Sequence, residues 1–305
     1  MTENASPFIV EVDDLCVQFG SFWAVKNVSF SVMPGEIFGF LGANGAGKTT
    51  TIRVICGLLQ ATKGRVVVGG EVFTPGHEER IKAKVGYMSQ KFTLYPDLSV
   101  GENLEFAAAI HDVPDDAFQQ RKKELFDMIQ FDRSEKDLVE DLPGGTKQQV
   151  ALVASMIHDP PLVVLDEPTA GVSPLARARF WELIQLLTKK GKTVFVTTHY
   201  MDEAENCHRI VFMRSGELIA LGSPQSLKEE TFQQPLYSLL PKGELVAKTL
   251  EDLKSQCSSL EPYGQHFHVI FKEGVEPLSW EEHFGVERIQ PSLEDVFIRR
   301  VEGDR

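Results

Sequence analysis

The chain has 305 residues with 44 acidic and 31 basic side chains, which give a formal net charge of −13 at pH 7. Because an extended nucleic-acid surface needs clustered basic side chains, this acidic balance predicts no nucleic-acid partner. The sequence lacks an apolar run of about 18 residues, which a membrane-spanning helix needs, and its acidic start MTENASPFIVEVDD does not resemble a secretory signal. The cysteines form no paired motif, so we expect four free thiols: Cys16, Cys56, Cys207 and Cys257.

The first predicted elements are antiparallel strands over residues 8–35 and 64–74, where apolar and polar residues alternate around the turns MPGE and VVVGGE. Between them, the apolar run from Ile37 to Leu41 predicts a buried strand, and TTIRVICGLL predicts a helix that Gly57 ends or interrupts. The intervening GANGAGKT fits the phosphate-binding pattern G-x-x-x-x-G-K-[ST] in the strand–loop–helix context that this pattern requires. A chance match in a glycine-rich turn is the alternative, and the flanking elements argue against it.

This loop predicts a site for nucleotide phosphates. Glycines let the backbone turn its N–H groups inward, and the N-terminus of the following helix adds a positive dipole. Lys48 can reach the β- and γ-phosphates, and the Thr49 hydroxyl can ligate Mg²⁺, which prefers hard oxygen ligands. The residues expected to contact the nucleotide here are Gly42, Asn44, Gly45, Ala46, Gly47, Lys48, Thr49 and Thr50.

Mostly helical residues are expected from about 92 to 155. GENLEFAAAIHDV and PDDAFQQRKKELFDMIQF are periodic, and the second segment places Phe118, Leu125 and Ile129 near one helix face. LPGGTKQQ then resembles a helix start that continues into VALVASMI, and its Pro143 suits the first helical turn.

A carboxylate-bearing strand follows in PPLVVLDEPTAG, where Leu162 to Leu165 predict a buried strand with Asp166 and Glu167 at its C-terminal end. Ligands of open α/β sheets gather at such strand ends. Adjacent strand residues point to opposite faces, so we expect Asp166 to hold Mg²⁺ and Glu167 to polarise an attacking water. A surface acidic pair is the alternative, which the apolar strand argues against.

A third strand of the same sheet, in KTVFVTTHYMDEAE, ends at His199. A lone histidine is more often structural than catalytic, but this one is expected at the sheet edge where it can sense a γ-phosphate. PLARARFWELIQLLTKKGK predicts an amphipathic helix before this strand, stopped near Gly191, and HRIVFMRSGELIALG predicts further strands after it.

Turn and polar residues increase in residues 224–305, which predicts a small C-terminal α+β appendage. HFHVIFKEG alternates like a strand and would place His266 and His268 on one face, which alone is a weak indication of a metal site. PSLEDVFIRRV offers Ser292 as an N-cap with Asp295 three residues on, as in a capping box.

In this order, the motifs resemble those of ABC-type ATPases, the nucleotide-binding subunits of membrane transporters. The resemblance runs from about Ile9 to Gly222, with GANGAGKT similar to Walker A, VGYMSQ to the Q-loop, LPGGTKQ to the signature, LVVLDEP to Walker B, AGVSP to the D-loop and THYMDEAE to the His switch. It implies an α/β fold with a P-loop NTPase (RecA-like) core and an antiparallel β subdomain in residues 1–223. A helical lid at about 92–155 and an accessory region at 224–305 complete the expected organisation.

LYPDLSVGENL, THYMDEAE and PSLEDVF are similar to the branch of that family that serves ABC-2 type exporters of drugs, lipids or glycans. The resemblance implies a cytoplasmic ATPase, peripheral on the cytoplasmic face of the cell membrane, that uses ATP and Mg²⁺. Its expected partners are an integral-membrane permease, which contacts the surface around Gln90 and KFTLYPDLSV, and a second ATPase subunit. ATP would lie between the Walker A loop of one subunit and the signature loop of the other.

The resemblance also assigns roles to single residues. Phe19 is expected to stack on adenine, with Phe22 and Trp23 as close rivals. Gln90 is expected to contact Mg²⁺ or the attacking water. We expect catalysis from Glu167, His199, Gln90 and Lys48, metal binding from Thr49, Gln90 and Asp166, and contacts to the facing nucleotide from Pro143, Gly144 and Gly145.

Two positions depart from the family pattern. Pro143 stands where the family usually has a serine that bonds the γ-phosphate across the interface, so one hydrogen bond worth about 1.5–3 kcal/mol is lost. Ser173 stands where the D-loop usually has aspartate. Two assemblies stay open, a homodimer with modified but working sites and a heterodimer with a different ATPase.

Two other functions also stay open. A soluble ABC ATPase that acts on ribosomes or DNA usually carries two cassettes or a long coiled-coil insertion, whereas this sequence contains one cassette. A non-hydrolysing nucleotide-binding regulator is disfavoured by the presence of both Glu167 and His199.

Overall fold

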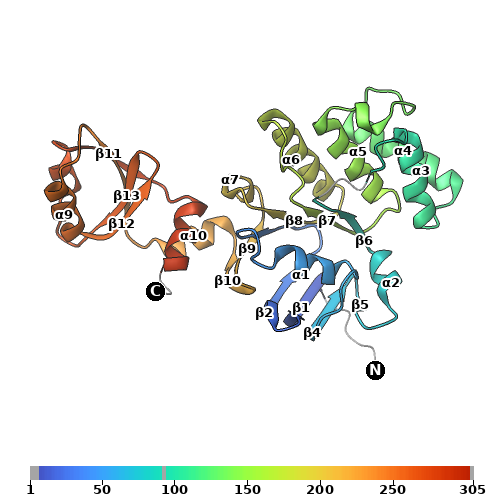
Figure 1. Ribbon diagram of the computed structural model, residues 1–305, viewed down its shortest axis with the longest axis horizontal. Coiled ribbons are helices and arrows are strands. Elements are labelled where there is room, and N and C mark those ends of the chain that lie inside the picture. Colours follow the sequence, from blue (N-terminus) through green and yellow to red (C-terminus); the bar gives the residue numbers. More distant parts are fainter. Residues whose placement is uncertain (1–6, 91–93, 303–305) are drawn as a thin grey trace. The chain divides into compact units, whose positions relative to one another are not determined.

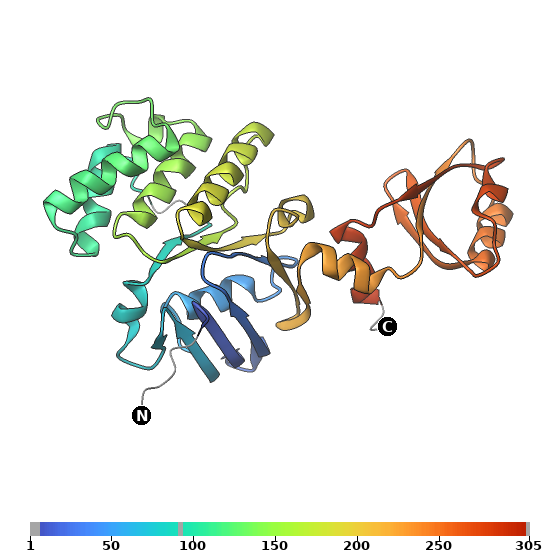
Figure 2. The ribbon, with the colours of Figure 1, turned by 180° about the vertical axis from the view of Figure 1, so that it is seen from behind.

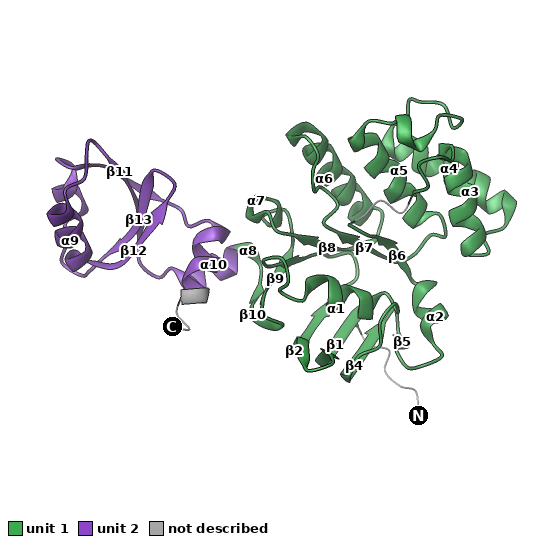
Figure 3. Ribbon diagram, viewed as in Figure 1, with its two compact units in different colours: residues 1–224 green, residues 225–305 purple. Residues whose placement is uncertain are grey.

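The computed structural model describes residues 7–90 and 94–302. The chain divides into two compact units, residues 1–224 and 225–305 (Figure 3). All residues expected to contact nucleotide or metal belong to the first unit, so each unit is described by itself, beginning with the first.

The centre of the first unit is a six-stranded sheet in the order β10–β9–β3–β8–β7–β6 (Figure 1). β10 is antiparallel to β9, and the other strands are parallel to their neighbours. Because parallel strands end at the same edge, the residues that follow β3, β7 and β8 are brought together. The strands are β3 (Ile37–Leu41), β6 (Val85–Met88), β7 (Leu162–Asp166), β8 (Thr193–Thr198), β9 (Arg209–Arg214) and β10 (Glu217–Gly222).

Helices cover both faces of this sheet, which explains why β3, β7 and β8 are buried along their whole length. Helix α1 (Lys48–Ile55) packs against β7 on one face, and α6 (Pro174–Lys189) packs against β3 and β8 on the other (Figures 1 and 2). Helix α6 begins after its N-cap Ser173 and ends before Gly191, whose φ of 83° is favourable for glycine. The short helix α7 (Met201–Ala204) follows β8.

An antiparallel sheet in the order β2–β1–β4–β5 forms the second layer of this unit. One hydrophobic core joins this sheet to α1 and to the central sheet. At its centre, Phe30 of β2 lies 5.4–6.1 Å, between ring centroids, from Phe38, Phe40 and Phe195 of the central sheet. The strands are β1 (Val10–Phe19), β2 (Phe22–Val32), β4 (Lys63–Val68) and β5 (Glu71–Val72).

A helical region lies between β6 and β7, after the short helix α2 (Glu78–Lys82). Ser99 begins α3 through a capping box, and Pro114 is the N-cap of α4, which buries the predicted face of Phe118, Leu125 and Ile129. The first residues of the predicted lid and of KFTLYPDLSV, at 91–93, lie outside the described residues. The region contains α3 (Val100–Ile110), α4 (Asp115–Ile129), the 3₁₀ helix η1 (Val139–Asp141) and α5 (Gly144–Met156).

Pro143 lies one residue earlier than the expected first helical turn. It is the N-cap of α5, with φ −57° and ψ 147°, and Gly144 is the first helical residue. The N-cap position does not use its own N–H in the helix ladder, so proline is accommodated there without losing a helical hydrogen bond.

The second unit contains an antiparallel sheet in the order β12–β13–β11–β14, with α9 packed against β12. Asp295 links α10 to this sheet, because it bonds Ser292 as in the expected capping box and its Oδ1 lies 2.6 Å from Nδ1 of His268. His266 instead bonds Ser238, and no group of three or more potential metal ligands occurs among the described residues. The elements are α8 (Pro224–Thr231), β11 (Leu236–Pro241), α9 (Ala247–Gln256), β12 (Cys257–Tyr263), β13 (His266–Phe271), η2 (Pro277–Trp280), β14 (Phe284–Ile289) and α10 (Leu293–Glu302).

All four cysteines are free and buried. Over residues 7–90 and 94–302, no helix combines the length and apolarity needed to cross a bilayer.

Candidate active site

The phosphate loop connects β3 to α1 and requires glycine at positions where it approaches other backbone. Gly47, the N-cap of α1, has φ 106°, and a Cβ at this position would lie 2.6 Å from the carbonyl oxygen of Ala24. A Cβ at Gly42 would lie 2.2 Å from the carbonyl oxygen of Met213. The loop is therefore pressed against β2 and β9, which fixes where the N-terminus of α1 points.

Lys48 is the first residue of α1 and has only 4% of its surface exposed. Its Nζ donates hydrogen bonds to the carbonyl oxygens of Gly42 at 2.7 Å and Ala43 at 3.3 Å. Burial lowers the pKa of Lys48, and the nearby carboxylates of Glu167 and Asp166 oppose this shift. The ammonium group thus lies inside the loop, at the place where phosphate oxygens would need a positive charge.

The Asp166 and Glu167 carboxylates take different positions, but the cause is not the expected alternation of side chains along a strand. Asp166 is the last residue of β7 and is 2% exposed, whereas Glu167 has left the strand with φ 50°. Thr197 of β8 stabilises this unusual backbone, because its Oγ1 accepts a hydrogen bond from the Glu167 N–H at 2.9 Å. The same hydroxyl donates to Oδ1 of Asp166 at 2.7 Å. One threonine therefore fixes both carboxylates.

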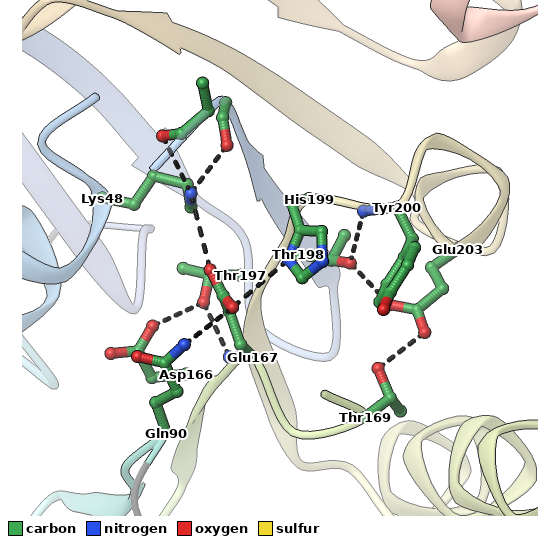
Figure 4. A network of polar contacts seen from close by, with 12 residues as sticks. Lys48, Gln90, Asp166, Glu167, Thr169, Thr197, Thr198, His199, Tyr200 and Glu203 are labelled. Atoms are coloured by element: carbon green, nitrogen blue, oxygen red, sulfur yellow. Dashed lines mark hydrogen bonds and ion pairs between the residues drawn. The ribbon is translucent and has the colours of Figure 1, made fainter. Parts of the chain in front are cut away.

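The structure brings four predicted catalytic residues into one cluster around the Glu167 carboxylate (Figure 4). Oε1 lies 3.7 Å from Nζ of Lys48. Oε2 accepts a hydrogen bond from Nε2 of Gln90 at 2.9 Å and lies 3.2 Å from Nδ1 of His199. Lys48, Gln90 and His199 come from α1, from the segment after β6 and from the residue that follows β8, so the parallel sheet creates the cluster.

Three predicted metal ligands also lie near this cluster and fit Mg²⁺ chemically. Thr49, the second residue of α1, is half-buried, and its hydroxyl has no hydrogen-bond partner in the described part of the chain. Asp166 offers carboxylate oxygens. Gln90 contacts Glu167 through its side-chain nitrogen, so the amide oxygen of Gln90 is available to a metal ion. Hydroxyl, carboxylate and amide oxygens are the hard ligands that Mg²⁺ prefers.

The expected adenine platform lies at the turn between β1 and β2. Phe19 is 51% exposed and is paired in register with Phe22, which is 63% exposed, while Trp23 is half-buried with Nζ of Lys63 6.0 Å from its ring. Both phenylalanines thus have accessible rings, so the geometry favours neither over the other.

The remaining predicted contacts do not join the Glu167 cluster. Pro143, Gly144 and Gly145 line a separate hollow of about 430 Å³, together with Gly171 and Ser173 from the segment before α6. Ser173 keeps a structural role there, since its Oγ accepts a hydrogen bond from the N–H of Ala176 at 3.3 Å and caps α6. Both sequence departures therefore occur in one surface region.

Sequence reasoning missed the residues that hold this cluster in place. Thr197 and Thr198 follow the apolar run VFV in a buried strand, which was a usable signal because hydroxyls in a buried strand need partners. Glu203 and Arg177 gave no comparable signal, since an acid in DEAE and an arginine in RAR are typical of exposed helix faces.

The phosphate loop after β3, the carboxylates after β7 and the helices between β6 and β7 define an ATP-binding cassette of the P-loop NTPase class. The family model described as "ABC transporter" matches residues 25–170. The chain is 41% identical over 223 residues to "Probable multidrug ABC transporter ATP-binding protein YbhF" of Escherichia coli (strain K12), covering 73% of this chain and 38% of that protein. It therefore spans about two fifths of that relative's length.

A second similarity extends through the C-terminal unit. The chain is 31% identical over 300 residues to "Nod factor export ATP-binding protein I" of Rhizobium leguminosarum bv. viciae, covering 97% of this chain and 96% of that protein. A solved structure titled "Dimeric structure of a post-hydrolysis state of the ATP-binding cassette MJ0796 bound to ADP and Pi" has a TM-score of 0.63 and 26% identity, covering 70% of this chain and 98% of that one. The chain belongs to the family of ABC transporter ATP-binding proteins.

Proposed function

We propose that this chain binds and hydrolyses ATP to drive a membrane exporter. The observation that carries the proposal is the Glu167 carboxylate, held within 3.7 Å of polar atoms of Lys48, Gln90 and His199 beside a phosphate loop. A carboxylate in that position can polarise a water, and catalysis of phosphoryl transfer depends mainly on such positioning and on electrostatics.

In this mechanism, the loop N–H groups and the Lys48 ammonium bind the phosphates, with the α1 dipole favouring their negative charge. Glu167 orients a water for in-line attack on the γ-phosphorus, and His199 and Gln90 hold the reacting groups in line. Thr49, Asp166 and Gln90 would hold Mg²⁺, which when bound neutralises charge on the β- and γ-phosphate oxygens. Phe19 or Phe22 would stack on the adenine.

We further propose a head-to-tail dimer in which Pro143, Gly144 and Gly145 face the nucleotide of the second subunit. The dimeric cassette MJ0796, which the chain resembles, supports this assembly. The α5 dipole and the N–H groups of Gly144 and Gly145 remain favourable to phosphate, although Pro143 has no hydroxyl. ATP binding would close the dimer and hydrolysis would reopen it.

An apolar groove supports the proposal of a membrane partner. It has a volume of about 350 Å³ and is lined by Leu58, Tyr95, Phe106 and Ile110, all exposed, together with Leu94. Exposed apolar side chains gathered in one groove mark protein-interaction sites. We propose that a short helix of an integral-membrane permease binds here, which would place the chain on the cytoplasmic face of the cell membrane.

The name "Nod factor export ATP-binding protein I" of one relative supports export as the direction of transport, and another relative is named as part of a probable multidrug transporter. We therefore propose a permease of the ABC-2 type and a drug, lipid or glycan as cargo.

The test is ATP hydrolysis by the purified full chain, with and without the co-purified permease. Glu167→Gln should abolish phosphate release while ATP still binds, whereas the control Glu182→Gln, on the exposed face of α6, should not change turnover. Normal turnover in Glu167→Gln would refute the assigned role, and absence of phosphate release from wild-type protein with its permease would support a non-hydrolysing regulator. Co-purification with ribosomes or DNA, but not with membranes, would refute the exporter.

The position of Pro143 and Ser173 in one hollow also favours testing a heterodimer. Sedimentation of Glu167→Gln with ATP decides between the assemblies. A stable dimer of this chain alone supports the homodimer, and a monomer that dimerises only with a second co-purified ATPase supports the heterodimer.

A further inference from the structure

Glu203 is a buried carboxylate outside the phosphate site. It lies in α7, four residues after His199, and only 2% of its surface is exposed. Oε1 accepts a hydrogen bond from Oγ1 of Thr169, and Oε2 accepts one from Oγ1 of Thr198, both at 2.6 Å (Figure 4). A buried carboxylate is costly without partners, so these contacts fix where Glu203 and both threonines lie.

Arg177 supplies the compensating charge. Its Nε lies 3.3 Å from Oε1 of Glu203 as an ion pair without hydrogen-bond geometry, and its guanidinium carbon lies 4.0 Å from the ring centroid of Tyr200. Arg177 belongs to the first turn of α6. The carboxylate thus joins the start of α6 to the residues that flank His199.

The two threonines belong to segments with different tasks. Thr169 lies in residues 168–173, the segment between Glu167 and the start of α6, which contributes Gly171 and Ser173 to the hollow beside Pro143. Thr198 immediately precedes His199, and its Oγ1 also accepts a hydrogen bond from the Tyr200 N–H at 3.0 Å.

Glu203 therefore restrains both ends of the 168–173 segment, through Thr169 and through Arg177, and it restrains the backbone on both sides of His199. Because its two oxygens serve the two segments, neither segment can shift by an ångström without breaking a short charged hydrogen bond. A hydrogen-bond network shared in this way gives the two segments a physical connection through which they can be coupled.

We propose that Glu203 is a positioning residue that couples the 168–173 segment to His199. This inference rests on the proposed ATPase function and deepens it. The segment borders the hollow that would face a second subunit, while Nδ1 of His199 lies 3.2 Å from the Glu167 carboxylate. A partner that engages the 168–173 segment thereby sets the position of His199 against the γ-phosphate, without contacting His199 itself.

The first test separates positioning from nucleotide binding. Glu203→Gln keeps the shape but replaces one acceptor oxygen by a donor, so kcat should fall on the order of tenfold while KM for ATP changes less than about twofold. The control Glu182→Gln, the same change on the exposed face of α6, should leave both constants unchanged.

A double-mutant cycle makes this test specific. In a His199→Ala background, Glu203→Gln should lower kcat by less than about twofold, because the two residues act as one unit. A tenfold loss in both backgrounds, or a KM that rises as kcat falls, would overturn the proposal. If Glu203→Gln does not fold, Thr169→Val carries the same cycle, since it removes one hydrogen bond to Glu203 and no charge.

The second test does not depend on turnover. Thr169→Val removes the contact on the 168–173 side, and hydrogen exchange of the amides in residues 199–204 should accelerate at least about threefold if the coupling exists. The acceleration should disappear in a Glu203→Gln background. Unchanged exchange of residues 199–204 in Thr169→Val would refute the coupling. A wild-type protein without ATPase activity would instead refute the proposed function, and the exchange result could still be interpreted.

Discussion

Replacing Thr197 by valine removes one oxygen from the centre of the active site while nearly preserving side-chain volume. The Thr197 hydroxyl is buried, donates to Asp166 at 2.7 Å and accepts from the Glu167 N–H at 2.9 Å. Since Glu167 has φ 50°, its backbone is held in a left-handed conformation that few non-glycine residues adopt. We expect Thr197→Val to release this restraint.

The magnitude follows from the two contacts. Losing a hydrogen bond to a carboxylate costs about 1.5–3 kcal/mol, and leaving the Glu167 N–H unsatisfied costs about 1–3 kcal/mol. Removing a buried hydroxyl that no longer needs desolvation offsets about 1–2 kcal/mol of this loss. The free energy of unfolding should therefore fall by about 3 kcal/mol, and kcat by about 10²-fold if Glu167 moves by about 1 Å.

Urea denaturation and steady-state phosphate release measure these two effects. Thr197→Ser is the matched control, because it keeps the hydroxyl and loses only a methyl group, at a cost of about 1 kcal/mol. The reasoning would be wrong if valine were tolerated with unchanged kcat, or if serine were as damaging as valine.

Three further outcomes are expected. Ser173→Ala should lower the free energy of unfolding by about 1 kcal/mol through loss of the α6 cap, whereas Ser173→Asp should change it by less than about 0.5 kcal/mol; thermal melts compare the two. Burial lowers the pKa of His158 from its ordinary 6.5 to about 4, and the charge of His111, whose ring is stacked 3.6 Å away, contributes to this shift. Between these two pH values the unfolded chain binds more protons than the folded chain, so the free energy of unfolding falls as the pH falls through this window. His158→Gln should therefore lose about 1 kcal/mol less than wild type between pH 7 and pH 5 in urea titrations, after allowance for partial exposure. Ile110→Asp should prevent permease co-purification without reducing ATPase activity of the isolated chain, and retained co-purification would contradict the proposed groove.

The elements around the nucleotide were predictable because each has a strong local pattern. The apolar run at Ile37–Leu41 forms β3 with the predicted bounds, and the glycine-rich loop after it needs glycine for steric reasons that the pattern already encodes. The meeting of Lys48, Glu167 and His199 also follows from the sequence, because parallel strands end at one sheet edge.

The network behind the cluster was not predictable in the same way. Several of its contacts join residues far apart in the chain, such as Thr197 with Glu167 at 30 positions and Thr169 with Glu203 at 34, and no periodicity encodes such pairs. The left-handed backbone at Glu167 also has no local signal, since glutamate gives no indication of positive φ. The alternation of side chains along a strand was therefore the wrong explanation for the different positions of Asp166 and Glu167.

The two departures from the family pattern lie in the same region of the structure. Pro143 and Ser173 line one hollow, and neither contacts the Glu167 cluster. Ser173 still caps α6, and Pro143 still precedes the first turn of α5, so both loops keep their backbone form without the usual serine hydroxyl and aspartate carboxylate. The changes thus leave this chain's own hydrolytic groups intact. In the proposed head-to-tail dimer, they would alter what this chain offers to the facing subunit. A partner with a complete signature loop would then form one full-strength site with this chain's Lys48 and Glu167, and one weakened site opposite Pro143.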